Sequence, residues 1–332
     1  MDSDKKKIMV TGGLGFIGTH LTGDLVQSGY EVAILDTAVP TAGQLRPGVE
    51  LINIDLRDGT AVQHAMSQLA SAGYETLIHL AGNADALRSV SVPVFDFEVN
   101  AQATVNVLAA ASKSGWKRAV IASSALVYGP STAKCQYETD LPDPVFPYAA
   151  SKLAAEFFAT SLSRCSDLEV MAARLFCIYG DSRNPENSPV EPTQYAARAA
   201  RGLPITVLGD PEKKVRDFVH ITDAVAALQL LADKGEGGCV YNVGTGVATS
   251  LRSLLALIGD HLGRPVAWEV DMSDMSDSYR LVANIDRLSM LGFAPSVMLP
   301  DALPAMLLNG ASKSKPASPI SRSPKLLGRG TL

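Results

Sequence analysis

Short apolar runs alternate with amphipathic segments along the first half of the chain. The apolar and β-branched runs are typical of buried strands, and apolar residues recurring every three or four positions are typical of helices. The predicted strands are Ile8–Val10, Val32–Leu35, Leu51–Ile54, Thr76–Leu80, Ala119–Ser123 and Val170–Phe176, and the predicted helices span 17–28, 59–71, 99–114 and 149–165. This alternation predicts an α/β fold built on a doubly wound parallel sheet.

Polar and small residues follow the ends of these predicted strands. Right-handed crossovers bring the carboxyl ends of parallel strands to one edge of the sheet, which is where such sheets bind ligands. The residues in these positions are Asp36, Asp55, Ala81-Gly82 and Ser123-Ser124. We expect the functional site at this edge.

The pattern changes after Gly180, where a Pro- and Asn-rich stretch is followed by short mixed segments. We expect a larger α/β domain over residues 1–180, to which 217–245 return, and a smaller substrate domain made of 181–216 and 246–309. Residues 310–332 are rich in Ser, Pro and basic residues, so this segment is expected to be a disordered tail.

Composition narrows the class of protein. The 332 residues are 47% hydrophobic and 19% charged, with a net charge of −5, so the chain can bury a sizeable core and is an unsuitable partner for nucleic acid. No long apolar run or signal peptide is recognisable, so we expect no membrane partner and a cytoplasmic location. The scattered cysteines, Cys135, Cys165, Cys177 and Cys239, predict free thiols and no metal site.

A glycine-rich turn joins the first predicted strand to the first predicted helix, with Gly12, Gly15 and Gly18 in a G-x-x-G-x-x-G spacing. Glycines here allow a tight turn, close approach of the backbone to a pyrophosphate, and close packing of the helix on the sheet. Such a turn alone can also be purely structural. In this context it predicts a dinucleotide-binding Rossmann domain over 1–180.

Asp36 ends the second predicted strand, about 20 residues after the glycine turn, where an acidic side chain can accept hydrogen bonds from an adenosine ribose. Its carboxylate would repel a 2′-phosphate, and Thr37 and Ala38 follow in place of a basic residue. The cofactor expected is therefore NAD rather than NADP. The alternative for Asp36 is a solvated strand end.

Tyr148 and Lys152 lie four residues apart at the start of a predicted helix, so their side chains share a face. An ammonium group beside a tyrosine stabilises the phenolate, which turns the tyrosine into a usable base. Ser124 follows the fifth strand and can relay a proton to or from Tyr148. The alternatives are a solvated helix face and an ordinary serine; the preceding glycine turn favours catalysis.

Several ordered motifs make the chain resemble the extended short-chain dehydrogenase/reductases, specifically the NAD-dependent nucleotide-sugar epimerases and dehydratases. Besides the glycine turn and Tyr148-Ala-Ala-Ser-Lys152, they include Asp55-Leu56-Arg57, His79-Leu80-Ala81-Gly82, Arg174-Leu-Phe-Cys-Ile-Tyr-Gly180 and Arg216-Asp217-Phe218. The resemblance extends from about residue 7 to about residue 300.

The resemblance implies a catalytic set and a cofactor-binding set. Ser124, Tyr148 and Lys152 would be catalytic. The implied cofactor-binding residues are Gly12, Gly15, Phe16, Ile17, Gly18, Asp36, Asp55, Leu56, Leu80, Ala81, Gly82, Asn100, Ser123, Tyr148 and Lys152. Asp55 and Leu56 would contact the adenine, and Ala81 and Gly82 the middle of the cofactor.

One departure from the family pattern narrows the reaction. Family dehydratases carry an acidic pair directly after the catalytic serine or threonine, because eliminating water requires another acid and base. Ala125 and Leu126 stand there instead, which disfavours dehydration and the related decarboxylation. The leading hypothesis is epimerisation through a transient ketone, which the resemblance places at C4 of a nucleotide sugar. The alternatives are net oxidation of a non-nucleotide sugar or alcohol and an inactive NAD-binding protein.

The expected substrate-binding residues are Arg88, Ser124, Tyr148, Cys177, Arg216 and Arg280. Cys177 stands where relatives usually have an asparagine against the diphosphate. Asp274 stands where a second arginine is usual, so either Arg280 substitutes for it or the substrate differs. The resemblance also implies a homodimer formed through helices 99–114 and 149–165, with burial inside the monomer as the alternative for their apolar faces.

Overall fold

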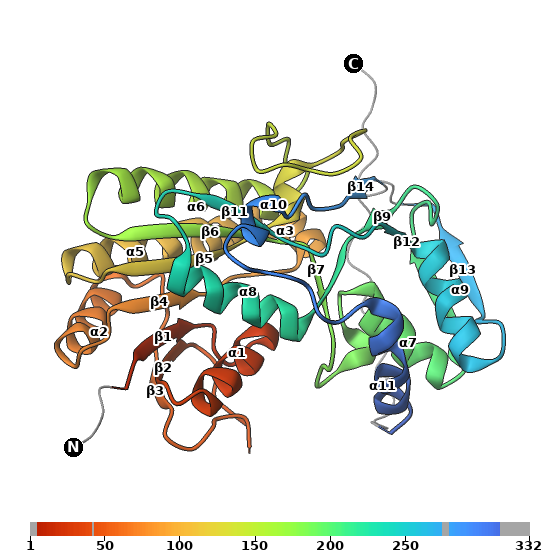
Figure 1. Ribbon diagram of the computed structural model, residues 1–332, viewed down its shortest axis with the longest axis horizontal. Helices are drawn as coiled ribbons and strands as arrows, with labels where there is room; N and C mark the ends of the chain where they lie inside the picture. The colour runs from red at the N-terminus through yellow and green to blue at the C-terminus, as the bar shows by residue number, and fades with distance from the viewer. Residues whose placement is uncertain (1–4, 42, 274–278, 313–332) are drawn as a thin grey trace.

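The computed structural model describes residues 5–41, 43–273 and 279–312, and its central feature is a seven-stranded sheet with the order β11-β6-β5-β4-β1-β2-β3 (Figure 1). All neighbouring pairs in it are parallel. Its strands are β1 (Lys7–Thr11), β2 (Glu31–Asp36), β3 (Glu50–Asn53), β4 (Thr76–His79), β5 (Arg118–Ser124), β6 (Glu169–Leu175) and β11 (Val240–Val243). The predicted doubly wound parallel sheet is confirmed.

Helices cover both faces of this sheet because alternate strand residues point to opposite sides. On β1, Ile8 and Val10 belong to a core shared with one group of helices, while Met9 between them belongs to a second core. The first core includes side chains of α1 (Phe16–Gln27) and α8 (Ile221–Lys234), and the second those of α2 (Gly59–Ser71), α5 (Ala103–Lys113) and α6 (Pro147–Cys165).

A third core lies in the part drawn on the right of Figure 1. Its helices are α7 (Glu191–Ala200), α9 (Leu251–Leu262) and α11 (Leu299–Ser312), and its parallel strands are β8 (Ile205–Leu208) and β13 (Trp268–Asp271). Three short strands, β9 (Val215–Arg216), β12 (Thr249–Ser250) and β14 (Arg280–Leu281), form a small sheet, and β7 (Cys177–Tyr179) pairs with β10 (Phe218–His220). The remaining short elements are α3 (Ala86–Ser91), α4 (Pro93–Phe97), η1 (Glu98–Gln102), η2 (Ala125–Tyr128), η3 (Pro185–Asn187) and α10 (Asp286–Ser289).

Two expected boundaries differ in the structure. The helix expected over 99–114 begins as a π-helical turn, η1, before α5. At the other end of the chain, α11 continues three residues into the segment 310–332 expected to be a tail. Gly310 packs so closely on α7 that a Cβ there would lie 2.7 Å from Ala197 Cα. The rest of the predicted tail lies outside the described residues.

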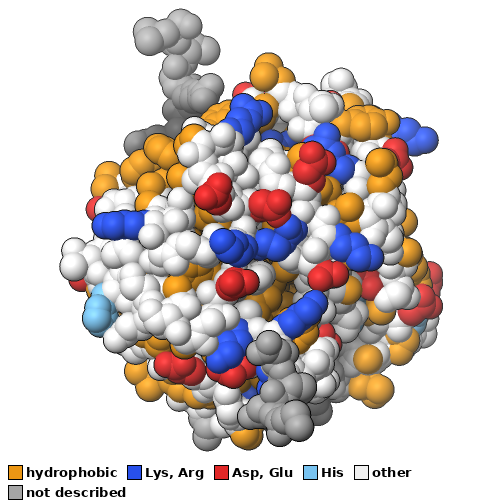
Figure 2. Space-filling view, turned by 60° about the vertical axis from the view of Figure 1, so that its left-hand side comes forward, with side chains coloured by type: hydrophobic (Ala, Val, Ile, Leu, Met, Phe, Trp, Pro, Cys, Tyr) orange, Lys and Arg blue, Asp and Glu red, His pale blue; other side chains and the backbone are white. Residues whose placement is uncertain are grey.

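Charges are mixed rather than sorted by sign on the face that Figure 2 presents, where Lys and Arg side chains alternate with Asp and Glu. Within the described residues, no helix combines the length and apolarity that crossing a membrane requires. Nor does that part of the chain gather three or more His, Cys, Asp or Glu side chains in a metal-binding arrangement.

Candidate functional site

The glycine turn lies between β1 and α1, at the carboxyl edge of the sheet. Gly12 has a φ of +67°, and a Cβ on it would lie 2.7 Å from the backbone nitrogen of Ala81. A Cβ on Gly18 would lie 2.2 Å from the Gly12 carbonyl oxygen. Both positions therefore require glycine. Gly15 is the N-cap of α1, and no side chain of the described residues caps this helix end. The backbone amides and the positive end of the helix dipole are therefore available to an anion.

Asp36 lies at the end of β2 and holds the glycine turn. Its Oδ2 accepts a hydrogen bond of 3.0 Å from the Leu14 amide, and its Oδ1 accepts one of 2.9 Å from the Ala38 amide. The carboxylate is half-buried and still has lone pairs for further donors. Its place beside the turn fits a ribose-binding residue.

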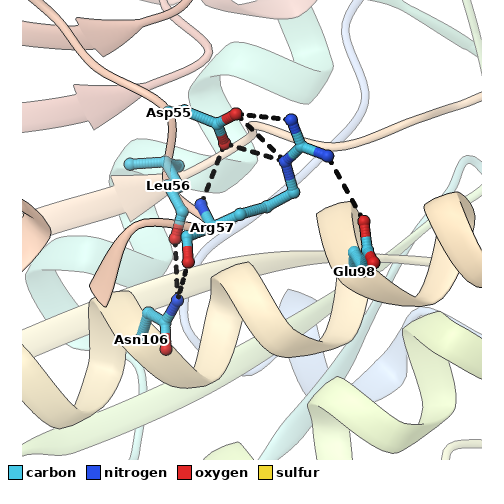
Figure 3. Close-up of polar contacts among 5 residues, drawn as sticks. All are labelled: Asp55, Leu56, Arg57, Glu98 and Asn106. Carbon is cyan, nitrogen blue, oxygen red and sulfur yellow. Dashed lines mark hydrogen bonds and ion pairs between the residues drawn. The ribbon is translucent and has the colours of Figure 1, made fainter.

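The loop after β3 forms the next part of the edge (Figure 3). The Arg57 guanidinium makes an ion pair with Asp55 at 2.6 Å and reaches Glu98 of η1 at 3.3 Å. Arg57 holds the pKa of Asp55 below its usual value, mainly through its side-chain hydrogen bonds. Asn106 of α5 donates 2.9 Å and 3.2 Å hydrogen bonds to the carbonyls of Leu56 and Arg57. The loop expected to face the adenine is thus fixed from two elements.

A buried histidine connects the glycine turn to the loop after β4. Thr11 donates a hydrogen bond of 2.7 Å to His79 Nδ1, and His79 Nε2 donates one of 2.9 Å to Thr104. The tautomer follows from Thr104, whose hydroxyl donates to the Asn100 carbonyl. Burial lowers the pKa of His79 to about 3, so the ring is neutral. The Ala81 amide donates to Thr11 at 3.2 Å and completes the connection.

Asn100 in η1 connects this loop to α6. Its Oδ1 accepts a hydrogen bond of 2.9 Å from the Asn83 amide, and its Nδ2 donates one of 3.1 Å to Ser151. A Cβ on Gly82, whose φ is +153°, would lie 2.4 Å from Asn100 Oδ1 and 3.3 Å from Lys152 Nζ. Leu80, Ala81 and Gly82 therefore pass directly beside the lysine at the start of α6.

Ser124, Tyr148 and Lys152 are brought together where β5 ends and α6 begins, and all three are buried. Tyr148 hydrogen-bonds Ser124 through their side chains, and its amide donates a bond of 3.0 Å to Ser89. Lys152 Nζ donates one of 3.0 Å to the Ala122 carbonyl. The predicted constellation forms because α6 starts at Pro147, so that one helical turn separates its tyrosine from its lysine.

Burial dominates the electrostatics of these groups. It raises the pKa of Tyr148 to about 12, against the lowering effect of the Ser124 hydrogen bond. It lowers the pKa of Lys152 to about 8, while Asp96 and Glu156 oppose this effect. The resting tyrosine is therefore a neutral phenol, and it needs further positive charge nearby before it can act as a base.

A buried ion pair between Arg174 and Glu156 lies next to Ser123 at the end of β5. Arg174 Nη2 lies 2.8 Å from Glu156 Oε2, and Ser123 donates to the other carboxylate oxygen. The Ser123 hydroxyl, expected to contact the cofactor, is therefore used in a buried hydrogen bond to Glu156. Ala125 is buried and Leu126 packs against the first core, so neither position supplies an acid or base.

The expected substrate-binding residues fall into two groups. Cys177 and Arg216 lie close together, because the Cys177 amide donates to the carbonyl of Asp217, and Arg280 lies on β14 directly beside β9. Burial raises the pKa of the Cys177 thiol to about 12, so it is not a thiolate. Arg88 is separate, exposed on α3 with its guanidinium 5.7 Å from the Phe95 ring centre. Asp274 lies outside the described residues.

Sequence reasoning missed several side chains that organise the site, notably Asp96, Asn83 and Ser151. No local pattern marks them, because their contacts join residues 13 to 55 positions apart.

A cavity of about 640 Å³ opens between α1, α8 and residues 181–184, and it is lined in part by Gly15, His20 and Arg183. The catalytic candidates do not line it.

The residues present fit NAD. Gly12 and Gly18 have no side chains, so the backbone of the turn and the start of α1 are open to a pyrophosphate. Further along the same edge, the carboxylate of Asp36 can bind a ribose. The Gly82 loop then leads to Tyr148 and Lys152, where a nicotinamide would meet a substrate.

Comparisons with known proteins agree with this geometry. The model of the NAD dependent epimerase/dehydratase family matches residues 8–244. A UDP-glucose 4-epimerase of Mycolicibacterium smegmatis is 30% identical over 306 residues, which cover 90% of this chain and 96% of that protein.

Two solved structures are similar throughout. The UDP-glucose 4-epimerase of Thermus thermophilus in complex with NAD superposes with a TM-score of 0.83 at 30% identity, covering 93% of this chain and 100% of that one. The UDP-glucose 4-epimerase of Thermotoga maritima with UDP-glucose gives 0.82 at 27% identity, covering 92% and 98%. The chain belongs to the NAD-dependent epimerase/dehydratase family.

Proposed function

We propose that this protein is an NAD-dependent epimerase that inverts C4 of a nucleotide sugar, with a UDP-sugar as the substrate. The observation that carries the proposal is the buried group Ser124, Tyr148 and Lys152 beside the Gly82 loop. The similarity to proteins named UDP-glucose 4-epimerase supports the choice of sugar position and nucleotide.

Bound NAD would supply the reversible acceptance and return of a hydride, and the protein's residues handle the proton and the charge. Tyr148 takes the proton of the C4 hydroxyl, with Ser124 hydrogen-bonded to the same oxygen. Lys152, held by the Ala122 carbonyl, stabilises the phenolate form of Tyr148 that accepts this proton, and the transfer leaves Tyr148 as a neutral phenol. Tyr148 then returns the proton to the C4 oxygen, while the hydride would come back to the opposite face of C4, so the configuration is inverted and no net oxidation occurs.

The side chains after Ser124 support epimerisation over dehydration. Eliminating water from a keto sugar needs an additional acid and base in contact with the substrate. Ala125 is buried and apolar, and Leu126 packs into the core beneath η2. We therefore expect the keto sugar to be reduced again without losing a substituent.

The test uses the full-length protein as purified. We expect it to contain bound NAD, and to convert UDP-glucose into an equilibrium mixture with UDP-galactose, followed by proton NMR, without release of NADH. Tyr148→Phe, which keeps the ring, is the inactive control. Stoichiometric release of NADH during turnover would instead establish a net dehydrogenase, and bound NAD without conversion of any nucleotide sugar would favour an inactive NAD-binding protein.

We further propose a homodimer formed by the outer surface of α6 and the neighbouring α4. Phe157 and Phe158 on α6 are 64% and 55% exposed, and Phe97 and Val94 on α4 are 52% and 71% exposed. Monomeric proteins rarely leave so many large apolar side chains together in water. The two helices pack on one another, and we propose that these side chains form one surface that a second copy covers.

A further inference from the structure

Asp96 is a completely buried carboxylate that the proposed reaction does not use directly. It lies on α4, and its Oδ2 accepts a hydrogen bond of 2.7 Å from Ser151, the residue before Lys152. Its Oδ1 accepts one of 2.7 Å from Asn83 Nδ2, in the loop that follows Gly82. One carboxylate therefore joins the catalytic helix to the loop beside the cofactor.

Burying a carboxylate is costly unless donors or positive charge compensate it. Two buried carboxylates influence Lys152, namely Asp96 and Glu156. Glu156 is already paired with Arg174 through three hydrogen bonds. In the described residues Asp96 has no such arginine partner, and its hydrogen bond to Ser151 places its carboxylate on the residue directly before Lys152.

The other charged groups around the start of α6 have partners elsewhere. Glu98 of η1 pairs with Arg57, and Arg88 of α3 lies over Phe95. The buried ring of His79 is neutral. Among the residues that the structure describes, Asp96 is consequently the carboxylate near both Tyr148 and Lys152 that has no arginine partner.

We propose that Asp96 is a positioning residue with two roles: it fixes Ser151 against the Gly82-Asn83 loop, and it supplies the buried negative charge that keeps Lys152 an ammonium ion. This inference deepens the proposed function and rests on it for the roles of Tyr148 and Lys152. Asp96 raises the pKa of both groups. Removing its charge must therefore move both ionisations to lower pH.

The first test is the pH profile of kcat/KM for epimerisation in Asp96→Asn. The expected profile keeps its bell shape, but both limbs lie lower by about one pH unit. Asp96 is an opposite charge to the Lys152 ammonium and a like charge to the Tyr148 phenolate, and a nearby charge is worth on the order of one pKa unit or more. Asp96→Glu, which retains the charge, is expected to keep both limbs in place. A role in structure alone would lower the plateau of Asp96→Asn without moving either limb, and that result would overturn the proposal.

Two further variants separate tethering from charge. Ser151→Ala removes a hydrogen bond to Asp96 but leaves its charge, so we expect a lower kcat with unmoved limbs. Asp85→Asn removes an exposed negative charge from the N-cap of α3, and we expect no movement of the limbs. If Asp85→Asn moves them as far as Asp96→Asn does, the effect is general electrostatics and the proposal fails.

A substrate-free titration distinguishes this inference from the proposed function. The tyrosinate absorbance of Tyr148 is obtained as the difference between the NAD-loaded protein and its Tyr148→Phe variant, in the presence and absence of Asp96→Asn. We expect Asp96→Asn to lower the pH of this transition. The shift without epimerase activity would refute the proposed function alone, whereas activity without the shift would refute the role of Asp96 alone. If Asp96→Asn does not fold, Asp96→Ser takes its place in both experiments.

Discussion

A rise in pH is expected to affect stability and catalysis in opposite directions, because Lys152 is a buried base. The unfolded chain holds a proton on this lysine up to about pH 10.5, whereas the folded protein releases it near pH 8. Between these values the unfolded state binds more protons, so stability rises with pH, by about 3 kcal/mol in total from this one group. Catalysis needs the protonated form and should fall over the same interval.

Lys152→Met tests this opposition. The variant removes the titrating group, so its free energy of unfolding should rise less than that of the native chain between pH 7.5 and 9.5, while epimerase activity is lost. Urea unfolding at the two pH values measures the effect. Lys117→Met, at an exposed position, should leave the native pH dependence intact; an identical pH dependence in Lys152→Met would show that Lys152 is not buried as a base.

Tyr148→Phe isolates the proton transfer. The ring still fills its buried position, but the hydroxyl that takes the sugar proton is gone. We expect kcat to fall by about 10²- to 10⁴-fold, which is the usual contribution of a general base, with NAD still bound. Steady-state kinetics together with cofactor absorbance measure both quantities, and near-native kcat would exclude Tyr148 as the base.

At the scale of elements, the turn between β1 and α1 depends on one close approach. A Cβ on Gly18 would meet the Gly12 carbonyl oxygen at 2.2 Å, whereas a Cβ on Gly23, one turn further along α1, meets only the flexible side chain of Arg46 at 3.6 Å. The two glycines share a helix and differ in what surrounds them. This contrast makes them a matched pair.

We expect Gly18→Ala to destabilise the protein by about 1–3 kcal/mol, because the helix must move away from the turn, and to weaken NAD binding. Gly23→Ala should instead be neutral or stabilising by up to about 1 kcal/mol, since alanine favours helix over glycine. Thermal unfolding and NAD titration compare them. Equal losses in the two variants would contradict a specific steric role for Gly18.

The sequence predicts most elements correctly because strand and helix periodicities are local. Ile8, Met9 and Val10 alternate between two cores, as a strand buried on both faces must. The π-helical turn η1 was not predictable, since an extra residue within one turn leaves the apolar spacing of 99–114 almost unchanged. Yet this turn carries Asn100, which contacts both Asn83 and Ser151.

At the scale of the whole molecule, long-range contacts set the limit of prediction. The pairing of Tyr148 with Lys152 is visible because both lie on one helix. The bond between Asp96 and Ser151 joins two elements 55 residues apart, and no pattern along the chain encodes it. The place of Arg280 opposite Val215, with Leu281 opposite Arg216, likewise depends on the pairing of β14 with β9.

The proposed dimer provides the prediction at this scale. Phe157→Asp combined with Phe158→Asp places charges on the outer surface of α6, where a partner would have to desolvate them. We expect light scattering to report a dimer for the native chain and a monomer for the double variant. Met290→Asp, at an 86% exposed apolar residue elsewhere, should remain dimeric; a monomeric native chain would refute the proposal.

The neutral His79, which lies between the glycine turn and η1, also provides a spectroscopic signal from inside the site. Of the five histidines in the chain, His79 is the one that is fully buried, and each of its ring nitrogens has a threonine partner. In nitrogen-15 spectra its imidazole should give a single fixed-tautomer signal that does not titrate between pH 5 and 8. Because Thr11 and Thr104 lie on opposite sides of this ring, cofactor loading should perturb the signal, which would give an intrinsic reporter of occupancy without any added label on the active groups.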